Sequence, residues 1–215
     1  MQTEIDFSTD GESARVLDDG AMLLRGYAVD DADLLLAAIA RISAAAPFRH
    51  MQTPGGQTMS VAMTNCGPYG WVTDRRGYRY QSEDPLSGQP WPSMPDEMLN
   101  LAVDAAAAAG YPSFKPDACL INRYEPGAKM GLHQDRDEAN LGQPVVSVSL
   151  GLPAVFLWGG PTRTSPRRRI ALHHGDVVVW GGPSRLYFHG VDILAAGQAG
   201  GMSNQRFNLT FRVSH

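Results

Sequence analysis

Residues 206–212 read Arg-Phe-Asn-Leu-Thr-Phe-Arg, and their side chains alternate strictly between polar and apolar. Successive side chains of a β-strand point to opposite faces, so the three apolar side chains share one face. The other face carries the polar side chains Arg206, Asn208, Thr210 and Arg212. The segment is therefore predicted to be a strand with one buried face. The polar face either meets solvent, as in most such strands, or binds a ligand.

Similar short apolar segments precede this one from residue 118 onwards, and Gly and Pro residues separate them. Strands that are interrupted by turns every 8–12 residues or so are typical of β-sandwiches, jelly rolls and barrels. The sequence therefore predicts a mainly β fold, with strands at Ala118–Tyr124, Val145–Leu150, Ala154–Trp158, Arg169–Leu172, Asp176–Trp180 and Arg206–Val213.

Two helices are expected before these strands, packed on the outside of one sheet. Asp31 can cap a helix that runs to about Ala46, and a second helix begins at Pro95-Asp96 and ends before Gly110. The first helix is predicted to place on one face the residues Leu34, Leu35, Ala38, Ile39 and Ile42. The stretch between the helices is rich in Gly, Thr, Tyr and Arg, with a strand-like piece at Met59–Thr64.

The composition is that of an ordinary globular protein. The chain has 215 residues, of which 43% are hydrophobic and 19% charged, and no point divides it into independent domains. No apolar run approaches the ~20 residues that cross a bilayer, and the N-terminus has no signal-peptide pattern. Cys66 and Cys119 are the only cysteines, which supports neither a disulfide framework nor a cysteine zinc site. A cytoplasmic protein is expected.

The net charge of −4 conceals an uneven distribution. Residues 1–33 carry nine acidic and two basic residues, whereas residues 34–215 carry 16 basic and 13 acidic ones. Basic residues gather in Arg75–Tyr80, where they alternate with aromatic ones, and in Arg167–Arg169. Such runs are usually solvated surface, but beside a binding site they can contact phosphates. The body of the chain can therefore accept a nucleic-acid partner.

A metal site is predicted from His133-Gln134-Asp135 and His189. In an extended segment, residues two apart share a face, so His133 and Asp135 point into one space. Two histidines and one carboxylate on a β-scaffold form the facial triad of non-haem Fe(II) oxygenases. The motif His-x-Asp alone occurs often by chance. The remaining histidines are more simply surface or core residues.

The polar face of residues 206–212 strengthens this prediction. A facial-triad iron that activates O₂ by oxidative decarboxylation needs an organic dianion as cosubstrate. Arg206 and Arg212 can hold the two carboxylates of 2-oxoglutarate by charge-assisted hydrogen bonds. Asn122 and Tyr124 share one face of their own predicted strand and can donate to the same ligand.

With these motifs in place, the sequence resembles the AlkB family of Fe(II)- and 2-oxoglutarate-dependent nucleic-acid demethylases over roughly residues 20–213. The runs that carry the resemblance are Met59–Gly67, Pro116–Tyr124, Ser149–Pro153, His173–Trp180 and the final Arg-x-Asn-x-Thr-x-Arg. The resemblance implies an α+β, mainly β fold: a double-stranded β-helix (jelly-roll) core with two flanking helices. Within the single domain 1–215 it implies an acidic N-terminal segment (1–20), a nucleotide-recognition lid (50–90) and a dioxygenase core (115–213).

The family's residue roles transfer to matching positions. The resemblance assigns Fe(II) to His133, Asp135 and His189. It assigns 2-oxoglutarate to Asn122, Tyr124, Arg206, Asn208 and Arg212. It assigns the damaged base and its backbone to Trp71, Tyr78, Tyr80, Asp137 and Arg163. Gly131 and Gln57 depart from the family pattern at the nucleic-acid surface, which affects strand affinity and length preference rather than the chemistry.

The implied reaction removes the methyl group of N1-methyladenine or N3-methylcytosine in DNA by hydroxylation. Fe(II) is the cofactor, 2-oxoglutarate and O₂ are cosubstrates, and formaldehyde, succinate and CO₂ are released. Single-stranded DNA is the expected partner, with double-stranded DNA and RNA as further candidates, for a monomer that binds no membrane. Because the methyl group lies on the Watson–Crick edge, the base must be flipped or already unpaired.

Two alternatives remain open at this point. The first is an Fe(II)/2-oxoglutarate oxygenase that acts on another substrate, such as RNA, tRNA or a small molecule. The second is a non-catalytic β-sandwich that binds nucleic acid or metal without turnover. The complete triad with both arginines favours an enzyme, and residues 57–80 favour DNA repair.

Overall fold

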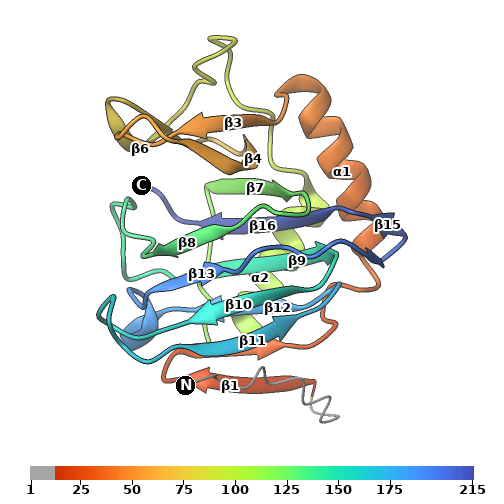
Figure 1. The fold of residues 1–215 in the computed structure, drawn as a ribbon, viewed down its shortest axis with the longest axis vertical. Coiled ribbons are helices and arrows are strands. Elements are labelled where there is room, and N and C mark those ends of the chain that lie inside the picture. The colour runs from red at the N-terminus through yellow and green to blue at the C-terminus, as the bar shows by residue number, and fades with distance from the viewer. Residues whose placement is uncertain (1–12) are drawn as a thin grey trace.

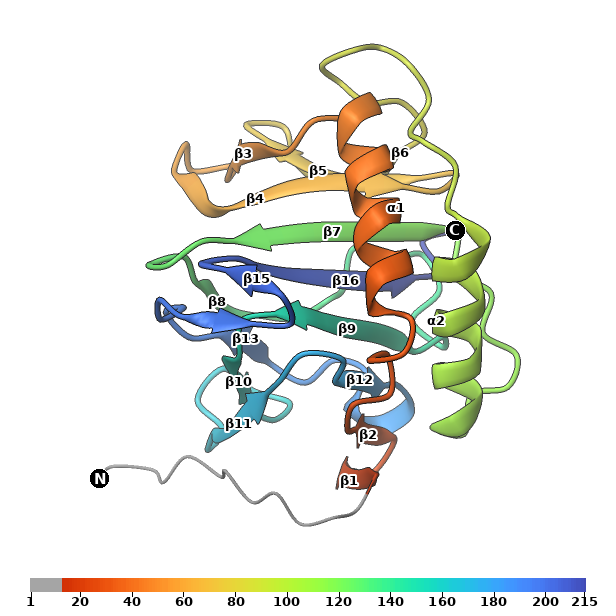
Figure 2. The same ribbon diagram turned by 90° about the vertical axis from the view of Figure 1, so that its right-hand side faces the viewer.

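The computed structural model of the chain describes residues 13–215. Two antiparallel β-sheets lie face to face, and two helices cover the outer face of the larger one (Figures 1 and 2). This is the jelly-roll core with two flanking helices that the sequence predicts. No helix within residues 13–215 is long and apolar enough to cross a membrane.

The larger sheet has eight strands in the order β1-β2-β12-β9-β16-β7-β4-β3. Their bounds are β1 Ala14–Asp18, β2 Ala21–Leu24, β3 Arg49–Gln52, β4 Thr58–Cys66, β7 Ala118–Tyr124, β9 Val145–Gly151, β12 Val177–Trp180 and β16 Arg206–Arg212. β16 lies between β9 and β7, hydrogen-bonded to both along its length. The alternating segment with which the sequence analysis began therefore stands near the middle of the sheet.

The smaller sheet has the order β11-β10-β13-β8. Its strands are β8 Met130–His133, β10 Ala154–Trp158, β11 Arg168–Leu172 and β13 His189–Val191. Two separate two-stranded sheets complete the structure, formed by β5 Gly70–Asp74 with β6 Gly77–Gln81 and by β14 Gln198–Ala199 with β15 Met202–Ser203. A 3₁₀ turn, η1, covers Gly182–Ser184.

Both predicted helices are present, as α1 Ala32–Ala45 and α2 Asp96–Ala108. They bury Leu35, Ile39 and Met98 against the same apolar cluster as the β16 residues Leu209 and Phe211. Gly110 follows the second helix with φ +92°, a left-handed conformation that glycine adopts without strain. The apolar face of β16 thus packs beneath the helices, and its polar face is left to point between the two sheets.

Two details of the first helix differ from the prediction. Leu34 is 59% exposed, because it stands at the edge of the apolar stripe rather than within it. Asp31 occupies the N-cap position but has helical dihedral angles and makes no side-chain cap bond. A capping side chain normally needs an extended backbone to reach the free amides, so α1 depends on packing rather than on a cap.

The N-terminal segment is also more structured than its composition indicated. Residues 1–12 of the predicted acidic segment 1–20 lie outside the described residues. Within the remainder, β1 pairs with β2 at the edge of the larger sheet. Val16 is exposed while its neighbour Leu17 is buried, so this short edge strand has little apolar alternation to reveal it.

Candidate active site

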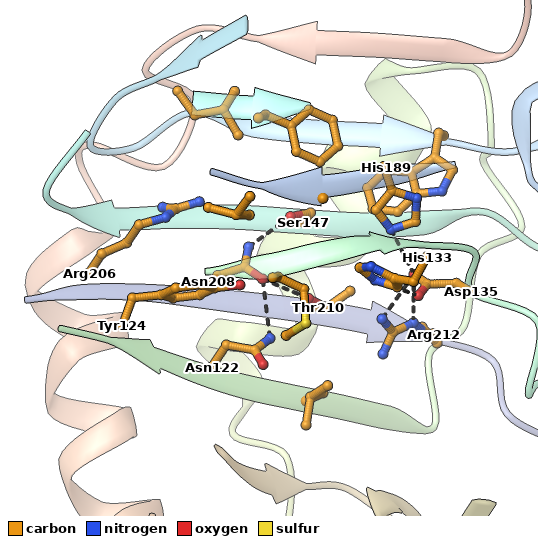
Figure 3. Close-up of a pocket in the computed structure, with 17 residues that line it drawn as sticks. Asn122, Tyr124, His133, Asp135, Ser147, His189, Arg206, Asn208, Thr210 and Arg212 are labelled. Atoms are coloured by element: carbon orange, nitrogen blue, oxygen red, sulfur yellow. Dashed lines mark hydrogen bonds and ion pairs between the residues drawn. The ribbon is translucent and has the colours of Figure 1, made fainter. Parts of the chain in front are cut away.

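A polar cavity lies between the two sheets, under the inward-facing side chains of β16 and β7 (Figure 3). All eight residues predicted to bind metal or cosubstrate line it: Asn122, Tyr124, His133, Asp135, His189, Arg206, Asn208 and Arg212. Almost all of the polar face of β16 is therefore buried in the cavity, and the interpretation of that face as solvated surface is wrong.

The two histidines are brought together by strand pairing. His133 at the end of β8 and His189 at the start of β13 are directly opposite each other in an antiparallel pair. Their ring centroids are 4.4 Å apart. Gly190 permits this close approach, because a Cβ there would lie 2.7 Å from the backbone oxygen of Met130. The sequence analysis placed His189 after a strand, and it begins one instead, since β13 has only three residues.

Asp135 completes the cluster two residues beyond β8. Its carboxylate oxygens lie 3.6 Å from His133 Nε2 and 3.7 Å from His189 Nε2. Each histidine donates its Nδ1–H to a backbone carbonyl, of Gly131 at 2.8 Å and of Tyr187 at 2.9 Å. Such bonds fix the ring orientation of metal-binding histidines and leave Nε2 free for the ion.

Charge in the cluster is suited to a cation. Burial alone would raise the pKa of Asp135, but Arg212 and the two histidines hold it below its ordinary value. Burial and the neighbouring His133 lower the pKa of His189 to about 4. The carboxylate is therefore ionised and the His189 imidazole neutral near pH 7, which are the forms that bind metals.

These residues fit a divalent metal ion. Their candidate ligand atoms all lie within 4.8 Å of one another, one from each residue. Two imidazoles and one carboxylate on one side of an ion leave coordination positions open on the other. His133 is 39% exposed and the other two residues are buried, so the open side faces the exposed histidine.

The opposite end of the cavity is marked by Arg206 (Figure 3). Its side chain donates to the Ser149 hydroxyl at 3.1 Å, and its residue is 1% exposed. Within residues 13–215, its Nε and Nη1 have no hydrogen-bond partner. Burial lowers the pKa of this guanidinium from its usual value, yet it remains charged at neutral pH. A buried cation with two free donors fits a carboxylate ligand.

Arg212 differs from Arg206, although both come from the same face of β16. Its Nε and Nη2 donate to Asp135 Oδ2 at 3.1 and 2.9 Å, and its Nε lies 3.3 Å from Glu138 Oε1. At about 3.3 Å per residue, the two arginines start roughly 20 Å apart along the strand. One therefore stands at each end of the cavity, as two carboxylates of one elongated ligand require.

Between the arginines, amide and hydroxyl groups form a buried chain. Asn122 donates to Asn208 Oδ1 at 3.3 Å, Thr210 donates to the same oxygen at 2.9 Å, and Asn208 donates to Ser147 at 2.8 Å. Burial raises the pKa of Tyr124 to about 12, so its hydroxyl keeps its proton. This floor is rigid and polar, and it can orient a polar ligand by hydrogen bonds.

The predicted base-binding residues lie outside the cavity lining but reach its metal end. The indole of Trp71 in β5 donates to Asp137 Oδ2 at 2.8 Å and stacks on Tyr78, with centroids 5.6 Å apart. Tyr80 in β6 donates to Glu138 Oε1 at 2.6 Å. The β5–β6 hairpin is therefore tied to residues 137 and 138, directly after the third residue of the metal cluster.

Arg163 and the two departures lie on the surface. Arg163 donates to the carbonyl of Leu132 at 2.9 Å and covers the Phe188 ring, so it stands beside both metal-binding segments. Arg76 is exposed and is paired with Asp74. Gly131 and Gln57 are both exposed.

Several site residues were not assigned from the sequence. Thr210 was visible on the polar face of 206–212, and Ser147 and Ser149 interrupt the apolar run Val145–Gly151 at every second position, which marks an inward polar face. Trp180 lines the cavity, and its Nε1 has no partner in the described part of the chain. Arg185 sits in a loop after η1 and has no local pattern that would reveal it.

Comparison with known proteins supports this arrangement. The model of the 2OG-Fe(II) oxygenase superfamily matches residues 20–212. The chain is 55% identical to the alpha-ketoglutarate-dependent dioxygenase AlkB of Escherichia coli (strain K12), over 90% of this chain and 89% of that protein. It is 48% identical to the AlkB homolog of Caulobacter vibrioides, over 78% and 74% of the two chains.

Solved structures include one with the same fold and a moderate sequence identity. The structure of OsALKBH1 superimposes with a TM-score of 0.81 at 31% identity, covering 93% of this chain and 99% of that one.

Proposed function

The chain belongs to the AlkB family of the 2OG-Fe(II) oxygenase superfamily, and we propose that it removes methyl groups from N1-methyladenine and N3-methylcytosine in DNA. It is an Fe(II)- and 2-oxoglutarate-dependent dioxygenase of the nucleic-acid demethylases, with O₂ as the second cosubstrate. The observation that carries the proposal is one cavity with a His–Asp–His cluster at one end and a buried arginine with free donors at the other.

We assign His133, Asp135 and His189 to the metal ion, because two neutral imidazoles and one ionised carboxylate converge there. When bound, Fe(II) supplies the redox chemistry that couples reduction of O₂ and oxidative decarboxylation of 2-oxoglutarate to hydroxylation of a C–H bond. The hydroxylated methyl group leaves the ring nitrogen as formaldehyde, while 2-oxoglutarate becomes succinate and CO₂.

The cosubstrate is held by the side chains between the two ends of the cavity. Arg206 binds one carboxylate through its free Nε and Nη1, and Arg212 attracts the other from the metal end. Asn122, Tyr124 and Asn208 line the path between them and orient the ligand by hydrogen bonds. The protein thereby fixes the ligand's direction, with its 2-oxo end at the metal.

The damaged base enters from the side of the β5–β6 hairpin. Trp71 offers a ring face for stacking, and Asp137 lies within hydrogen-bond distance of its indole. N1-methyladenine and N3-methylcytosine carry a positive charge on the ring, which both a carboxylate and an aromatic face attract. Tyr78 stacks beside Trp71, Tyr80 anchors the hairpin through Glu138, and Arg163 can contact the backbone phosphate near the metal.

Finer features of the proposal follow from this site. Single-stranded DNA is the preferred partner, because its bases need no unpairing, with double-stranded DNA and RNA as further substrates. Residues 50–90 act as the nucleotide-recognition lid, residues 115–213 as the dioxygenase core and residues 1–20 as an acidic N-terminal segment. We also propose a monomer in the cytoplasm, where two buried free thiols, Cys66 and Cys119, remain reduced.

The test uses purified protein with Fe(II), 2-oxoglutarate and air. Matched single-stranded oligonucleotides carry one N1-methyladenine, one N3-methylcytosine or no methyl group. We expect formaldehyde and the unmethylated base only with the methylated strands, together with stoichiometric succinate. Succinate without loss of the methyl group from either strand would indicate an oxygenase with another substrate.

A further inference from the structure

The two segments that carry the metal cluster hold each other by reciprocal bonds. Arg185, four residues before His189, donates from Nη1 to the backbone carbonyl of Asp135 at 2.6 Å. Gln134 donates from Nε2 to the backbone carbonyl of Leu186 at 2.6 Å. Each segment thus sends a side chain to the main chain of the other. Both bonds lie beyond the His133–His189 pair of the β8–β13 ladder.

Arg185 is shaped into this position by three acceptors. Besides the Asp135 carbonyl, its Nε donates to the Gln143 carbonyl at 2.8 Å and its Nη2 to Glu138 Oε2 at 3.0 Å. Its side chain is 3% exposed, and it is not among the residues that line the cavity. A planar guanidinium reaches three such acceptors at once, whereas a single ammonium does not.

Glu138 closes the arrangement into a ring. Its other oxygen, Oε1, lies 3.3 Å from Arg212 Nε, and Arg212 in turn bonds the carboxylate of Asp135. Asp135 is therefore held twice, at its main-chain carbonyl by Arg185 and at its carboxylate by Arg212. The loop that carries the acidic member of the metal cluster has little freedom to turn away.

We propose that Arg185 and Gln134 are positioning residues that keep Asp135 aimed at the two histidines. The proposal rests on the proposed function, which makes these three residues the metal ligands. Without the reciprocal bonds, the 134–138 loop is joined to the 185–189 segment mainly through the metal cluster itself. Metal affinity then falls, and a displaced ligand lets 2-oxoglutarate be consumed without hydroxylation of the base.

The experiment compares Arg185→Lys and Gln134→Ala with wild type. Arg25→Lys is the matched control, because Arg25 also bonds a buried carboxylate, of Asp176, and a backbone carbonyl, of Ala171, away from the metal cluster. Metal-free protein is titrated with Mn²⁺ alone and the dissociation constant is measured. The ratio of succinate to formaldehyde is then measured with the Fe(II)-loaded proteins and a methylated oligonucleotide.

We expect the Mn²⁺ dissociation constant to rise about tenfold for Arg185→Lys, which is typical of lost support to a metal ligand, and severalfold for Gln134→Ala. The succinate-to-formaldehyde ratio should rise in the same order. Arg25→Lys should lower the melting temperature and leave both readouts unchanged, because a purely structural arginine has no reason to alter them.

Wild-type Mn²⁺ affinity and ratio in both Arg185→Lys and Gln134→Ala would overturn the proposal. If Arg185→Lys does not fold, Gln134→Ala decides alone, because the half-buried Gln134 carries no charge and its removal leaves the core packed. If wild-type protein binds no Mn²⁺ and yields no formaldehyde, the proposed function itself has failed, and the positioning roles fail with it.

Discussion

The cavity and the β5–β6 hairpin are built in opposite ways. The cavity residues Asn122 and Arg206 come from strands in the middle of an eight-stranded sheet and are 4% and 1% exposed. The hairpin strands pair only with each other, and Tyr78 at the hairpin is 49% exposed. Towards the metal end, the hairpin is held by the side-chain bonds Trp71–Asp137 and Tyr80–Glu138.

This difference separates chemistry from recognition. A buried ladder holds its side chains within a narrow range of positions, as a metal and its cosubstrate require. A two-stranded hairpin has marginal stability by itself, so it can adjust to a bulky, variable nucleic-acid strand. Substitutions in the cavity should therefore act alike on every nucleic-acid substrate, whereas substitutions in the hairpin should discriminate between substrates.

The largest effect is expected for Asp135→Ala. Losing a charged metal ligand should lower metal affinity by more than about a hundredfold, beyond what outer contacts contribute, and reduce demethylation to background. Arg212 keeps Glu138 as a partner at 3.3 Å, so the β-core should still fold. Mn²⁺ titration and circular dichroism check the two parts. Retained metal affinity in a folded variant would show that the cluster is not the metal site.

A contrast between the two arginines comes next. Arg206→Met removes free donors, so 2-oxoglutarate affinity should fall about tenfold or more, since a bond between charged groups contributes ~1.5–3 kcal/mol. The ligand-free protein should be no less stable, because no acidic side chain loses its partner. Calorimetric titration with 2-oxoglutarate and thermal unfolding test both parts.

Arg212→Met is the control for this contrast. It leaves the buried Asp135 without its guanidinium partner, which typically costs about 3–5 kcal/mol of unfolding free energy. Equal destabilisation by the two substitutions would mean that Arg206 supports the fold as Arg212 does, and would remove the reason to assign it to the cosubstrate.

In the hairpin, Trp71→Ala should reduce activity on every lesion, because stacking contributes about 1–3 kcal/mol per base whichever base is present. The substitution also removes the hydrogen bond to Asp137. The 2-oxoglutarate KM should stay unchanged. Steady-state kinetics on single-stranded oligonucleotides, at fixed salt, measure both constants.

Asp137→Asn should instead change the choice of lesion. Its negative charge favours a cationic ring, and a unit charge at ~4 Å in an effective dielectric near 20 is worth about 4 kcal/mol before desolvation, so even a fraction changes the preference severalfold. The kcat/KM for N1-methyladenine and N3-methylcytosine should fall more than that for neutral N3-methylthymine. Equal losses on the three lesions would leave Asp137 only the task of holding Trp71.

The smallest effect is expected for Tyr80→Phe. The substitution removes one hydrogen bond, to Glu138, and such a bond contributes about 1 kcal/mol, which corresponds to roughly fivefold in affinity. The KM for the methylated oligonucleotide should rise by about this factor and the 2-oxoglutarate KM should not change. A selective rise in the 2-oxoglutarate KM would place Tyr80 with the cavity rather than with the hairpin.

The same division explains what the sequence could predict. Strand β16 and the two helices carry strong periodic patterns, so their bounds agree with prediction to within two residues. The strands β8 and β13 have four and three residues, too few for any period to show, although they bring His133 and His189 together. Their meeting depends on long-range pairing and on the lack of a side chain at Gly190.

The ring around Asp135 had no counterpart in the sequence analysis. Arg185 is 47 residues from Glu138 and 50 from Asp135, and nothing next to it in the chain marks it as a partner of either. The different partners of Arg206 and Arg212 were also hidden, since strand alternation fixes the face of a side chain but not what it contacts. The resemblance to a known family assigned roles to single residues, and the structure adds how those residues are held.

The most direct test of the division between cavity and hairpin is a two-by-two set of KM values. The KM values of 2-oxoglutarate and of an N3-methylcytosine oligonucleotide are measured for Arg206→Lys and Trp71→Ala against wild type. The account predicts that Arg206→Lys raises the first about tenfold and leaves the second within twofold or so, and that Trp71→Ala does the reverse. If each substitution raises both values to the same extent, the cavity and the hairpin are one functional unit and the account is contradicted.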